Sequence, residues 1–306
     1  MIVYKCKKCN GEMVIDPSGA LYCAYCGAKG NFSDAELEGY REFRGQMLNY
    51  LKNLHDTEEG DSYLDMLWGR AETVTFISDD DTDITVSYLY TATEGPATMY
   101  FARKNVLYYF PKEQEMYADK MENELSKLQF PPADIKGLDR CFPKITGRFN
   151  LKDGGKLLAF AKEDTVFPLA MYGALPYQHV AWIISRMENI CCVLEYSELC
   201  HDGISPDALF INPVTHEARL YGGWWACHAK NNNPMAINRD LSAIRKVALR
   251  VLGYRNSDVP FAMKKFLGKE TRATAYDDFS EWDEVIEKNL GGRHFHKMDA
   301  TDGLNM

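Results

Sequence analysis

The sequence predicts an α+β fold with a small β-rich lobe, a larger helical lobe after it, and a short cysteine-rich segment in front of both. Two Cys-x-x-Cys pairs occur within the first 26 residues. Alternating apolar residues separated by turn signals follow from about residue 70, and apolar stripes at helical spacing dominate after residue 171. These changes divide the chain into four parts: 1–30, 31–69, 70–170 and 171–306.

The composition is that of a globular protein, because 46% of the 306 residues are hydrophobic and 26% are charged. The formal net charge of −9 argues against a protein whose main role is to coat nucleic acid or an anionic membrane. The longest stretch without acidic residues, lysine or arginine, residues 165–185, contains Pro168 and Pro176 and is not expected to span a membrane. The N-terminus lacks the apolar stretch of a signal peptide, so we expect a cytoplasmic protein.

The first part, 1–30, contains four cysteines whose spacing is typical of a zinc ribbon. The two Cys-x-x-Cys pairs are separated by thirteen residues, and a turn sequence, Asp16 to Gly19, lies between two short apolar runs. Each pair can form a tight turn that points both thiolates at one ion, and two such turns complete a tetrahedral site. The alternatives are a redox-active pair or a pair of disulfides. We expect structural zinc, bound by Cys6, Cys9, Cys23 and Cys26.

The second part, 31–69, is expected to link the ribbon to the lobes. Ser33 and Glu36 form a capping box, and apolar residues at helical spacing follow, which predicts a helix from about 34 to 54. Residues 56–83 then contain ten acidic residues against one arginine. We interpret this acidic stretch as solvated linker and loop, with a docking surface for a basic partner as the alternative.

The two lobes follow from the periodicity of their apolar residues. The small lobe, 70–170, is predicted to contain the strands ETVTFIS, DITVSYLYTA and TMYFARKN, a helix over 113–128, and short strands over 145–170. The larger lobe, 171–306, contains three apolar stripes at helical spacing, with the short strands LFIN and EARLY between the first two. The stripes extend over 180–194, 241–252 and 279–290.

This order of elements, together with the segment HDGISPDALFINPVTHEARLYGG, resembles the protein-kinase family over roughly residues 70–295. In kinases a long helix leads into a catalytic loop H-x-D-x-x-x-x-N, followed by two short strands and Asp-Phe-Gly. His201 takes the position of the loop histidine, where we expect a structural imidazole. Asp240 resembles the aspartate of a later helix that ties back to this loop. The resemblance therefore implies a bilobal kinase-like fold.

The residues that handle phosphate and metal in kinases are replaced at each matching position. Gly203 stands for the catalytic aspartate, Ala208 for the metal-binding asparagine and Gly222 for the aspartate of Asp-Phe-Gly. None of the three has a side chain that can ligate Mg²⁺ or accept a proton, and phosphoryl transfer depends on both. The resemblance therefore implies a pseudokinase, and we expect no binding of ATP with Mg²⁺. Trp224 and Trp225 are expected to fill the core or the cleft.

The small lobe offers one vestige of a nucleotide site. Lys104 resembles the lysine of the third kinase strand, and Glu124 resembles the helix glutamate that pairs with it. The alternative is that Lys104 is a solvated lysine at the end of a strand and that Glu124 is one of several acidic residues on its helix. The segment SDDDTDITV, over 78–86, stands where kinases have their glycine-rich loop, and its carboxylates are expected to repel ATP.

Two functions remain open. The first is a catalytically inactive, kinase-like scaffold or allosteric regulator that binds a protein partner, and chains of this kind resemble proteins of bacterial and phage settings. The second is an atypical nucleotide-using transferase that retains Lys104 and Glu124 and recruits Asp202. The ribbon carries four lysines against two acids, an excess too small to predict nucleic-acid binding. Arg293, His294 and His296 are expected to make a contact within the helical lobe.

Overall fold

The computed structural model describes most of both lobes and part of the ribbon. The described residues are 64–132, 137–172, 174–231, 233, 235–253, 258–294 and 296–298, with positions 6, 8, 13–15, 21–23, 26–30, 35 and 38 of the N-terminal parts. Positions 35 and 38 are helical, and the rest of the predicted helix 34–54 lies outside the described residues. Residues 64–68 form a helical segment that leads into the small lobe.

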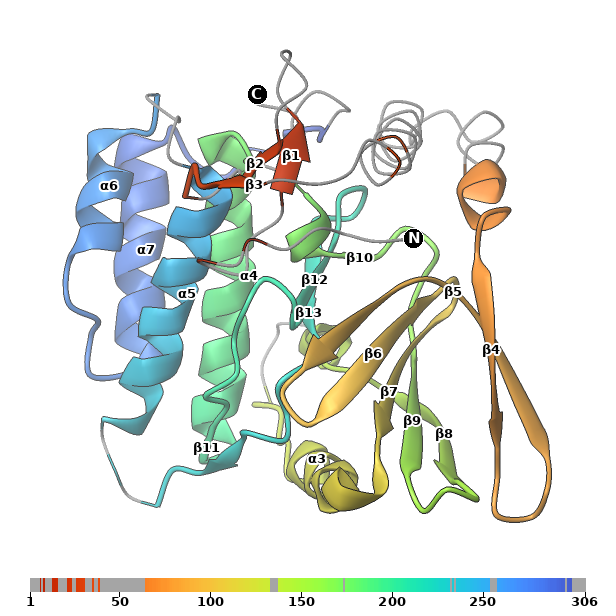
Figure 1. The fold of residues 1–306 in the computed structure, drawn as a ribbon. Helices are drawn as coiled ribbons and strands as arrows, with labels where there is room; N and C mark the ends of the chain where they lie inside the picture. The colour runs from red at the N-terminus through yellow and green to blue at the C-terminus, as the bar shows by residue number, and fades with distance from the viewer. Residues whose placement is uncertain are drawn as a thin grey trace.

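The small lobe is built on a six-stranded antiparallel sheet in the order β4-β5-β6-β7-β9-β8 (Figure 1). An isolated bridge joins Ser78 to Leu151, and the amide of Lys152 donates to the carbonyl of Ile77 at 2.9 Å. These contacts connect the two edges, so the sheet is strongly curled. The strands are β4 Glu72–Ile77, β5 Asp83–Glu94, β6 Ala97–Ala102, β7 Asn105–Phe110, β8 Ile145–Asn150 and β9 Lys156–Ala161.

The sheet contains one strand more before its helix than the sequence predicts. The expected strand TMYFARKN is divided into β6 and β7 by a bend at Arg103 and Lys104. Helix α3 (Met116–Ser126) follows β7 after the short 3-10 turn η1 (Lys112–Gln114), and it buries Ala118, Met121 and Glu124. The strand that leads into the helix is therefore β7, whose successive residues pack into two different apolar clusters, one on each side of the sheet.

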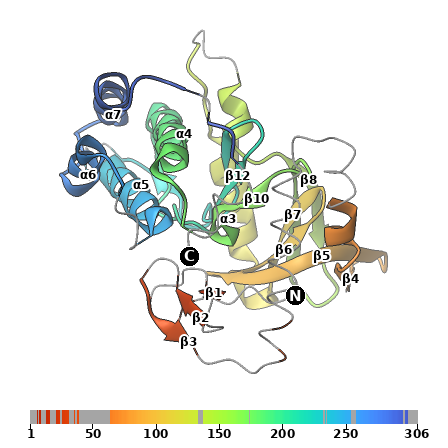
Figure 2. The same ribbon diagram turned by 90° about the horizontal axis from the view of Figure 1, so that it is seen from above.

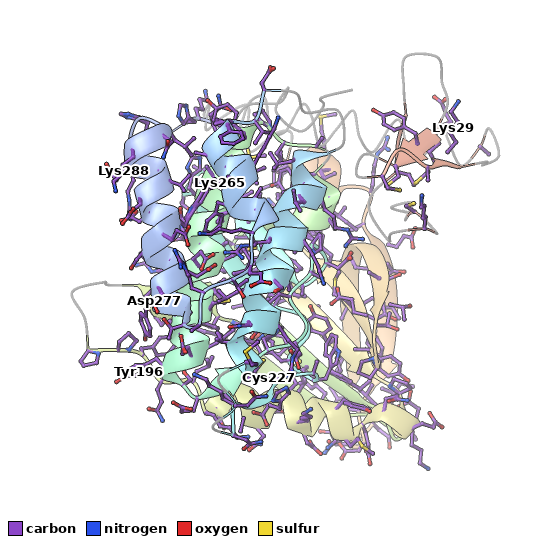
Figure 3. All side chains as sticks on the ribbon, turned by 90° about the vertical axis from the view of Figure 1, so that its left-hand side faces the viewer. Lys29, Tyr196, Cys227, Lys265, Asp277 and Lys288 are labelled. Carbon is purple, nitrogen blue, oxygen red and sulfur yellow. The ribbon has the colours of Figure 1, made fainter. Side chains whose placement is uncertain are left out.

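The helical lobe is organised around α4, as the periodicity predicts. Its long apolar face packs against α5 and α7. Figure 3 shows Tyr196, at the end of α4, and Asp277, near the start of α7, towards the same end of this lobe, and Lys288 at the other end. The two helices therefore run antiparallel. The helices are α4 Tyr177–Tyr196, α5 Ala236–Leu252, α6 Phe261–Gly268 and α7 Ala275–Asn289.

Two polar contacts hold the start of α7 in place. The side chain of Thr274 caps α7 by accepting from the amide of Asp277 at 3.0 Å. The guanidinium of Arg245, on α5, donates to both carboxylate oxygens of Asp278, on α7, at 2.8 Å, and the two side chains are 4% and 0% exposed. This pair bridges α5 and α7 inside the lobe.

Short strands connect the lobes and carry the loops of the candidate site. The expected strands LFIN and EARLY form the hairpin of β12 (Leu209–Asn212) and β13 (Glu217–Leu220), with β10 (Phe167–Pro168) beside β12. A second pair joins β11 (Leu199–Cys200) to β14 (His228–Ala229). Of two further 3-10 turns, η2 (Leu138–Cys141) lies between α3 and β8, and η3 (Leu169–Met171) follows β10. The chain thus folds as a bilobal, kinase-like α+β structure.

The ribbon forms a separate small sheet outside the six-stranded sheet and the helices, as Figures 1 and 2 show. Its strands are β1 (Met13–Ile15), β2 (Leu21–Cys23) and β3 (Lys29–Gly30), in the order β1-β2-β3. The two strands expected between the cysteine pairs are thus present, whereas the expected turn at 16–19 lies outside the described residues. Among the described helices, none has both the length and the apolar composition that crossing a bilayer requires.

Candidate functional site

The carboxylate of Asp240, on α5, holds the loop that follows β11 in place. One carboxylate oxygen of Asp240 accepts from the amide of His201 at 2.7 Å, and the other accepts from the amide of Asp202 at 2.8 Å. Asp240 is fully buried, and burial raises its pKa to about 6. The tie between the later helix and the loop, expected from the sequence, is therefore confirmed.

His201 is enclosed within this loop. Its Nδ1 accepts from the amide of Gly203 at 3.2 Å, and its ring meets Trp224 edge-on with centroids 4.8 Å apart. Complete burial lowers the pKa of His201 to about 3, so the ring is neutral. A neutral, fully enclosed imidazole positions the loop and the tryptophan, as the expected structural role requires.

Gly203, which the sequence resemblance matches to the kinase catalytic aspartate, lies directly against the backbone of Gly223. A Cβ atom on Gly203 would lie 2.9 Å from both the Cα and the carbonyl oxygen of Gly223. Gly223 has φ +83°, and a Cβ there would lie 2.6 Å from the ring of His201. Because the opposing atoms belong to the backbone, a side chain at 203 would require the two loops to move apart.

Gly222, which the sequence resemblance matches to the metal-binding aspartate of kinases, faces two side chains of the small lobe. A Cβ on Gly222 would lie 2.5 Å from the Oε2 of Glu94, 2.9 Å from the hydroxyl of Tyr108 and 3.0 Å from the Cα of Ala208. Tyr108 is fully buried on β7, and Ala208 is 1% exposed. The space that a metal-binding carboxylate would need is therefore occupied by Glu94 and Tyr108.

The turn between β5 and β6 closes over the same region. At its tip a Cβ on Gly95 would lie 2.9 Å from the indole nitrogen of Trp225, so the turn rests on this ring. Trp225 also meets Tyr108 and Phe110 edge-on, with centroids 5.5 and 6.0 Å apart. Trp225 therefore fills the region between the lobes, and Trp224 is fully buried beside it, in agreement with the sequence expectation.

The structure does not join Lys104 to Glu124. Lys104 lies at the bend between β6 and β7, where its carbonyl accepts from the amide of Lys162 at 2.9 Å. The Oε1 of Glu124 is instead 2.6 Å from the Nζ of Lys127 on the same helix. Across the described part of the chain, Lys104 has no ion pair. The prediction fails because the additional strand β7 takes the place that the sequence assigned to the strand of Lys104.

The same shift moves the acidic segment SDDDTDITV away from the cleft. Its first half forms the turn between β4 and β5, where the hydroxyl of Ser78 donates to Asp80 and the ammonium of Lys152 pairs with Asp81. The amide of Asp79 donates to the carbonyl of Asn150 at 3.0 Å, at the end of β8. By position in the sheet, the counterpart of the kinase glycine-rich loop is the β5–β6 turn rather than this segment.

Asp202, the alternative catalytic base, is engaged on the side of the loop next to α5. Its Oδ1 accepts from Arg239 at 2.7 Å, and its Oδ2 lies 2.8 Å from the Nε2 of His228. Partial burial alone would raise the pKa of Asp202, but hydrogen bonds from Arg239 and His228 outweigh it and hold the pKa below its usual value. A carboxylate that is paired with two basic groups is a poor proton acceptor.

Cys200 completes a group with Asp202 and His228 whose ligand atoms all lie within 4.8 Å of one another. Arg239 already supplies a positive charge there, because its Nη2 lies 3.0 Å from the Nε2 of His228 and 3.9 Å from the sulfur of Cys200. A metal ion would have to displace this guanidinium, so the group fits an ion-pair network better than a metal site.

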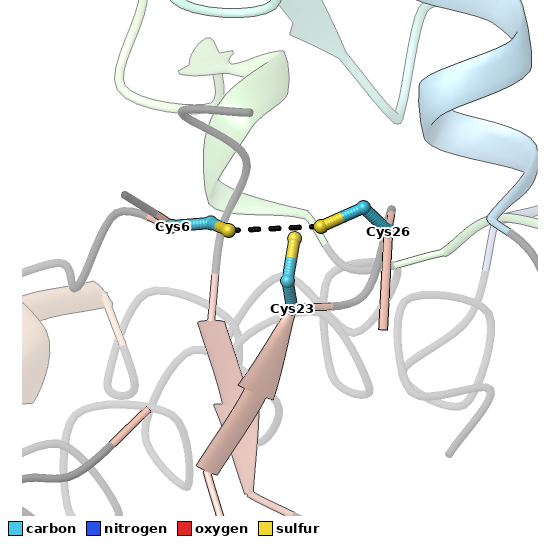
Figure 4. A group of neighbouring side chains, drawn as sticks. All are labelled: Cys6, Cys23 and Cys26. Atoms are coloured by element: carbon cyan, nitrogen blue, oxygen red, sulfur yellow. Dashed lines mark hydrogen bonds between the residues drawn. The ribbon is translucent and has the colours of Figure 1, made fainter. Parts of the chain in front are cut away.

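Three of the four predicted zinc ligands converge. The sulfur atoms of Cys6, Cys23 and Cys26 lie within 4.8 Å of one another, and those of Cys6 and Cys26 are 3.6 Å apart (Figure 4). Tetrahedral zinc with Zn–S bonds of about 2.3 Å requires sulfur atoms roughly 3.8 Å apart. The amide of residue Lys8 also donates to the sulfur of Cys6 at 3.4 Å. The donor set therefore fits zinc, and Cys9 lies outside the described residues.

Two functional side chains of the cleft were not predicted from the sequence. Glu94 lies in the segment TEGPA, which signals a turn but gives no indication of what that turn covers. Tyr108 lies in the aromatic run NVLYYF, which would have identified β7 as a separate strand. Their convergence on Gly222 depends on three distant segments of the chain.

Comparisons with known proteins give a likeness of fold and no close relative. No family model matches the chain, and no curated protein matches its sequence. Similar solved structures include the BubR1 kinase domain (11% identity, 67% of this chain and 80% of that chain, TM-score 0.47). They also include vaccinia related kinase 3 (11% identity, 80% of this chain and 98% of that chain, TM-score 0.46). A third is the Drosophila melanogaster PAN3 pseudokinase (13% identity, 64% of this chain and 61% of that chain, TM-score 0.42).

Proposed function

We propose that the chain is a catalytically inactive, kinase-like protein whose two-lobed body binds a protein partner, as a scaffold or an allosteric regulator. The single observation that carries the proposal is the occupation of the metal-binding position: Glu94 and Tyr108 lie where a side chain on Gly222 would have to be. The loop geometry around Asp240 is retained, so the framework persists without the groups that handle magnesium and phosphate.

The electrostatics of the cleft support the same conclusion. An ionised Glu94 carboxylate about 4 Å from a phosphate charge would repel it by about 4 kcal/mol at an effective dielectric constant of about 20, before screening. The turn at Gly95 rests on Trp225, so entry of a triphosphate would also require the β5–β6 hairpin to lift from this ring. Both effects oppose ATP binding.

A protein partner is the ligand class that suits this architecture. Two lobes joined by short connections can adopt different relative positions, and a partner that prefers one of them acts as a regulator. We propose that zinc, bound by Cys6, Cys9, Cys23 and Cys26, stabilises the ribbon as a structural ion. About thirty residues bury too little apolar surface to fold without such support.

A thermal-shift experiment tests the proposed inactivity. A ligand present at 100 times its dissociation constant stabilises the folded state by about 2.7 kcal/mol. For a chain of this size, such a gain corresponds to a rise of roughly 5–10 °C in melting temperature. We expect no rise with ATP and Mg²⁺, and a reproducible Mg²⁺-dependent rise would count against the proposal.

The alternative, an atypical nucleotide-using transferase, has less support. It depends on Lys104 paired with Glu124 and on an available Asp202, whereas Glu124 pairs with Lys127 and Asp202 pairs with Arg239. Incorporation of label from radioactive nucleotides that is lost in Asp202→Asn would favour it over an inactive protein.

A further inference from the structure

A pocket of about 380 Å³ lies in the helical lobe, away from the cleft between Gly222 and Trp225. It is bounded by the first half of α4, the turn between β12 and β13, the end of α7 and the segment after α7. Gly291 and Gly292, with φ +79° and +92°, reverse the chain after α7, and this reversal places His294 at the pocket. The volume lies within the range of small-molecule sites.

The lining of this pocket is basic although the chain as a whole is acidic. Among the described residues that line it, five have a basic side chain and none is an aspartate or a glutamate. A net charge of −9 makes such a concentration of basic groups unexpected by composition alone. The five are Arg186, His216, Arg293, His294 and His296.

Arg186 is the cation best placed to receive an anion. Its Nε donates to the carbonyl oxygen of His216 at 2.8 Å, which holds the guanidinium plane in place. Within the described part of the chain, no carboxylate is within ion-pair distance of Arg186, whereas Arg293 is paired with Asp283. A fixed guanidinium without a carboxylate partner presents donors in the geometry that carboxylate and phosphate groups accept.

An aromatic wall stands beside this cation. The rings of Trp182 and His216 are stacked, with centroids 4.5 Å apart and planes 5° from parallel. His216 is 6% exposed, and burial, followed by the charges of His179, Arg186 and His296, lowers its pKa to about 4. The imidazole is therefore neutral at neutral pH and covers one face of Trp182, while the indole of Trp182 and the guanidinium of Arg186 both line the pocket.

We propose that this pocket binds a small planar aromatic anion, an aryl phosphate or aryl carboxylate, with its ring against Trp182 and its anionic group at Arg186. The inference does not depend on the function proposed for the cleft, because the two regions share no residue. None of the described residues that line the pocket is an aspartate or a glutamate, and the carboxylate of Asp283 is paired with Arg293.

Titration calorimetry of the full chain at about pH 7 with phenyl phosphate and benzoate tests the proposal, since each probe carries a ring and an anionic group. Inorganic phosphate and benzyl alcohol carry one feature each and serve as controls. We expect at least one of the two aryl anions to bind at least about tenfold more tightly than either control. The proposal would be overturned if neither aryl anion bound at least about tenfold more tightly than both controls, or if neither bound at all up to about 10 mM.

Variants separate the pocket from the rest of the surface. Arg186→Gln is expected to weaken binding of the aryl anion about tenfold or more, while Arg186→Lys keeps the charge and part of the affinity. Arg272→Gln, which changes an exposed arginine paired with Glu281, is the matched control and should bind as the parent does. Should Arg186→Gln fail to fold, Trp182→Leu provides the second test, and unchanged affinity in either folded variant would refute the site.

Discussion

The close approach of the Gly203 and Gly223 backbones predicts the effect of Gly203→Ala. This substitution adds one methyl group at the position of the kinase catalytic aspartate, 2.9 Å from two backbone atoms of Gly223. Gly223 is itself crowded, because a Cβ on it would lie 2.6 Å from the ring of His201 and 2.8 Å from the carbonyl oxygen of Gly203. Forcing one methylene-sized group into such a contact typically costs about 1–3 kcal/mol. We therefore expect a melting temperature lower by roughly 2–12 °C.

The matched control is Gly268→Ala, at the end of α6, where an added Cβ would have no atom within 4 Å. Both substitutions reduce the flexibility of the unfolded chain by a similar amount, so the difference between them isolates the folded-state contact. Gly268→Ala should be neutral or stabilising by up to about 1 kcal/mol. Both variants are compared with the parent by urea denaturation.

Equal stability of Gly203→Ala and the parent would refute the steric reasoning, because the loop would then have room for a side chain. The packing of the two loops would then not explain why position 203 is a glycine. A large loss of stability in Gly268→Ala would instead show that this variant is not a valid control for Gly203→Ala.

Three further predictions concern other parts of the chain. Asp278→Ala should lower the free energy of unfolding by about 3–5 kcal/mol in urea denaturation, because it leaves Arg245 buried without its carboxylate, and a loss below 1 kcal/mol would contradict the buried pair. Metal analysis should find one zinc per chain, and Cys26→Ser should lose it together with the ordered ribbon; full retention of zinc would exclude this cysteine as a ligand. Lys162 is buried, which lowers its pKa to about 7 from 10.5, so the unfolded state binds more protons between these values. The stability of the parent relative to Lys162→Met should therefore rise from pH 7 towards pH 10.5, and a flat or falling difference would show that this ammonium is not desolvated.

The parts of the fold that depend on local patterns could be predicted from the sequence. Apolar residues at a spacing of 3.6 identified the positions of α4, α5 and α7, and the loop around His201 followed from its distance to the strands after it. Asp240 could be assigned because its position at the start of a buried helix is part of the resemblance. The structure agrees with these predictions because each sequence signal lies within one segment of about twenty residues.

The small lobe shows why the rest could not be predicted. The bend between β6 and β7 consists of Arg103 and Lys104, which carry no glycine or proline signal, so the two strands read as one. The strands of the small lobe were matched to kinase strands in chain order. Reading β6 and β7 as one strand therefore moved the expected positions of the paired lysine and of the glycine-rich loop by one strand. The contact of Glu94 and Tyr108 with Gly222 depends on tertiary packing, which no local pattern records.

The measurement that tests the central claim most directly is titration calorimetry of the parent protein with ATP in the presence of Mg²⁺. We propose that Glu94 and Tyr108, which lie against Gly222, and the turn on Trp225 leave no room for a metal-bound triphosphate, so we expect no saturable heat up to about 1 mM nucleotide. Saturable binding that requires Mg²⁺ and is abolished by a non-hydrolysable competitor would contradict it.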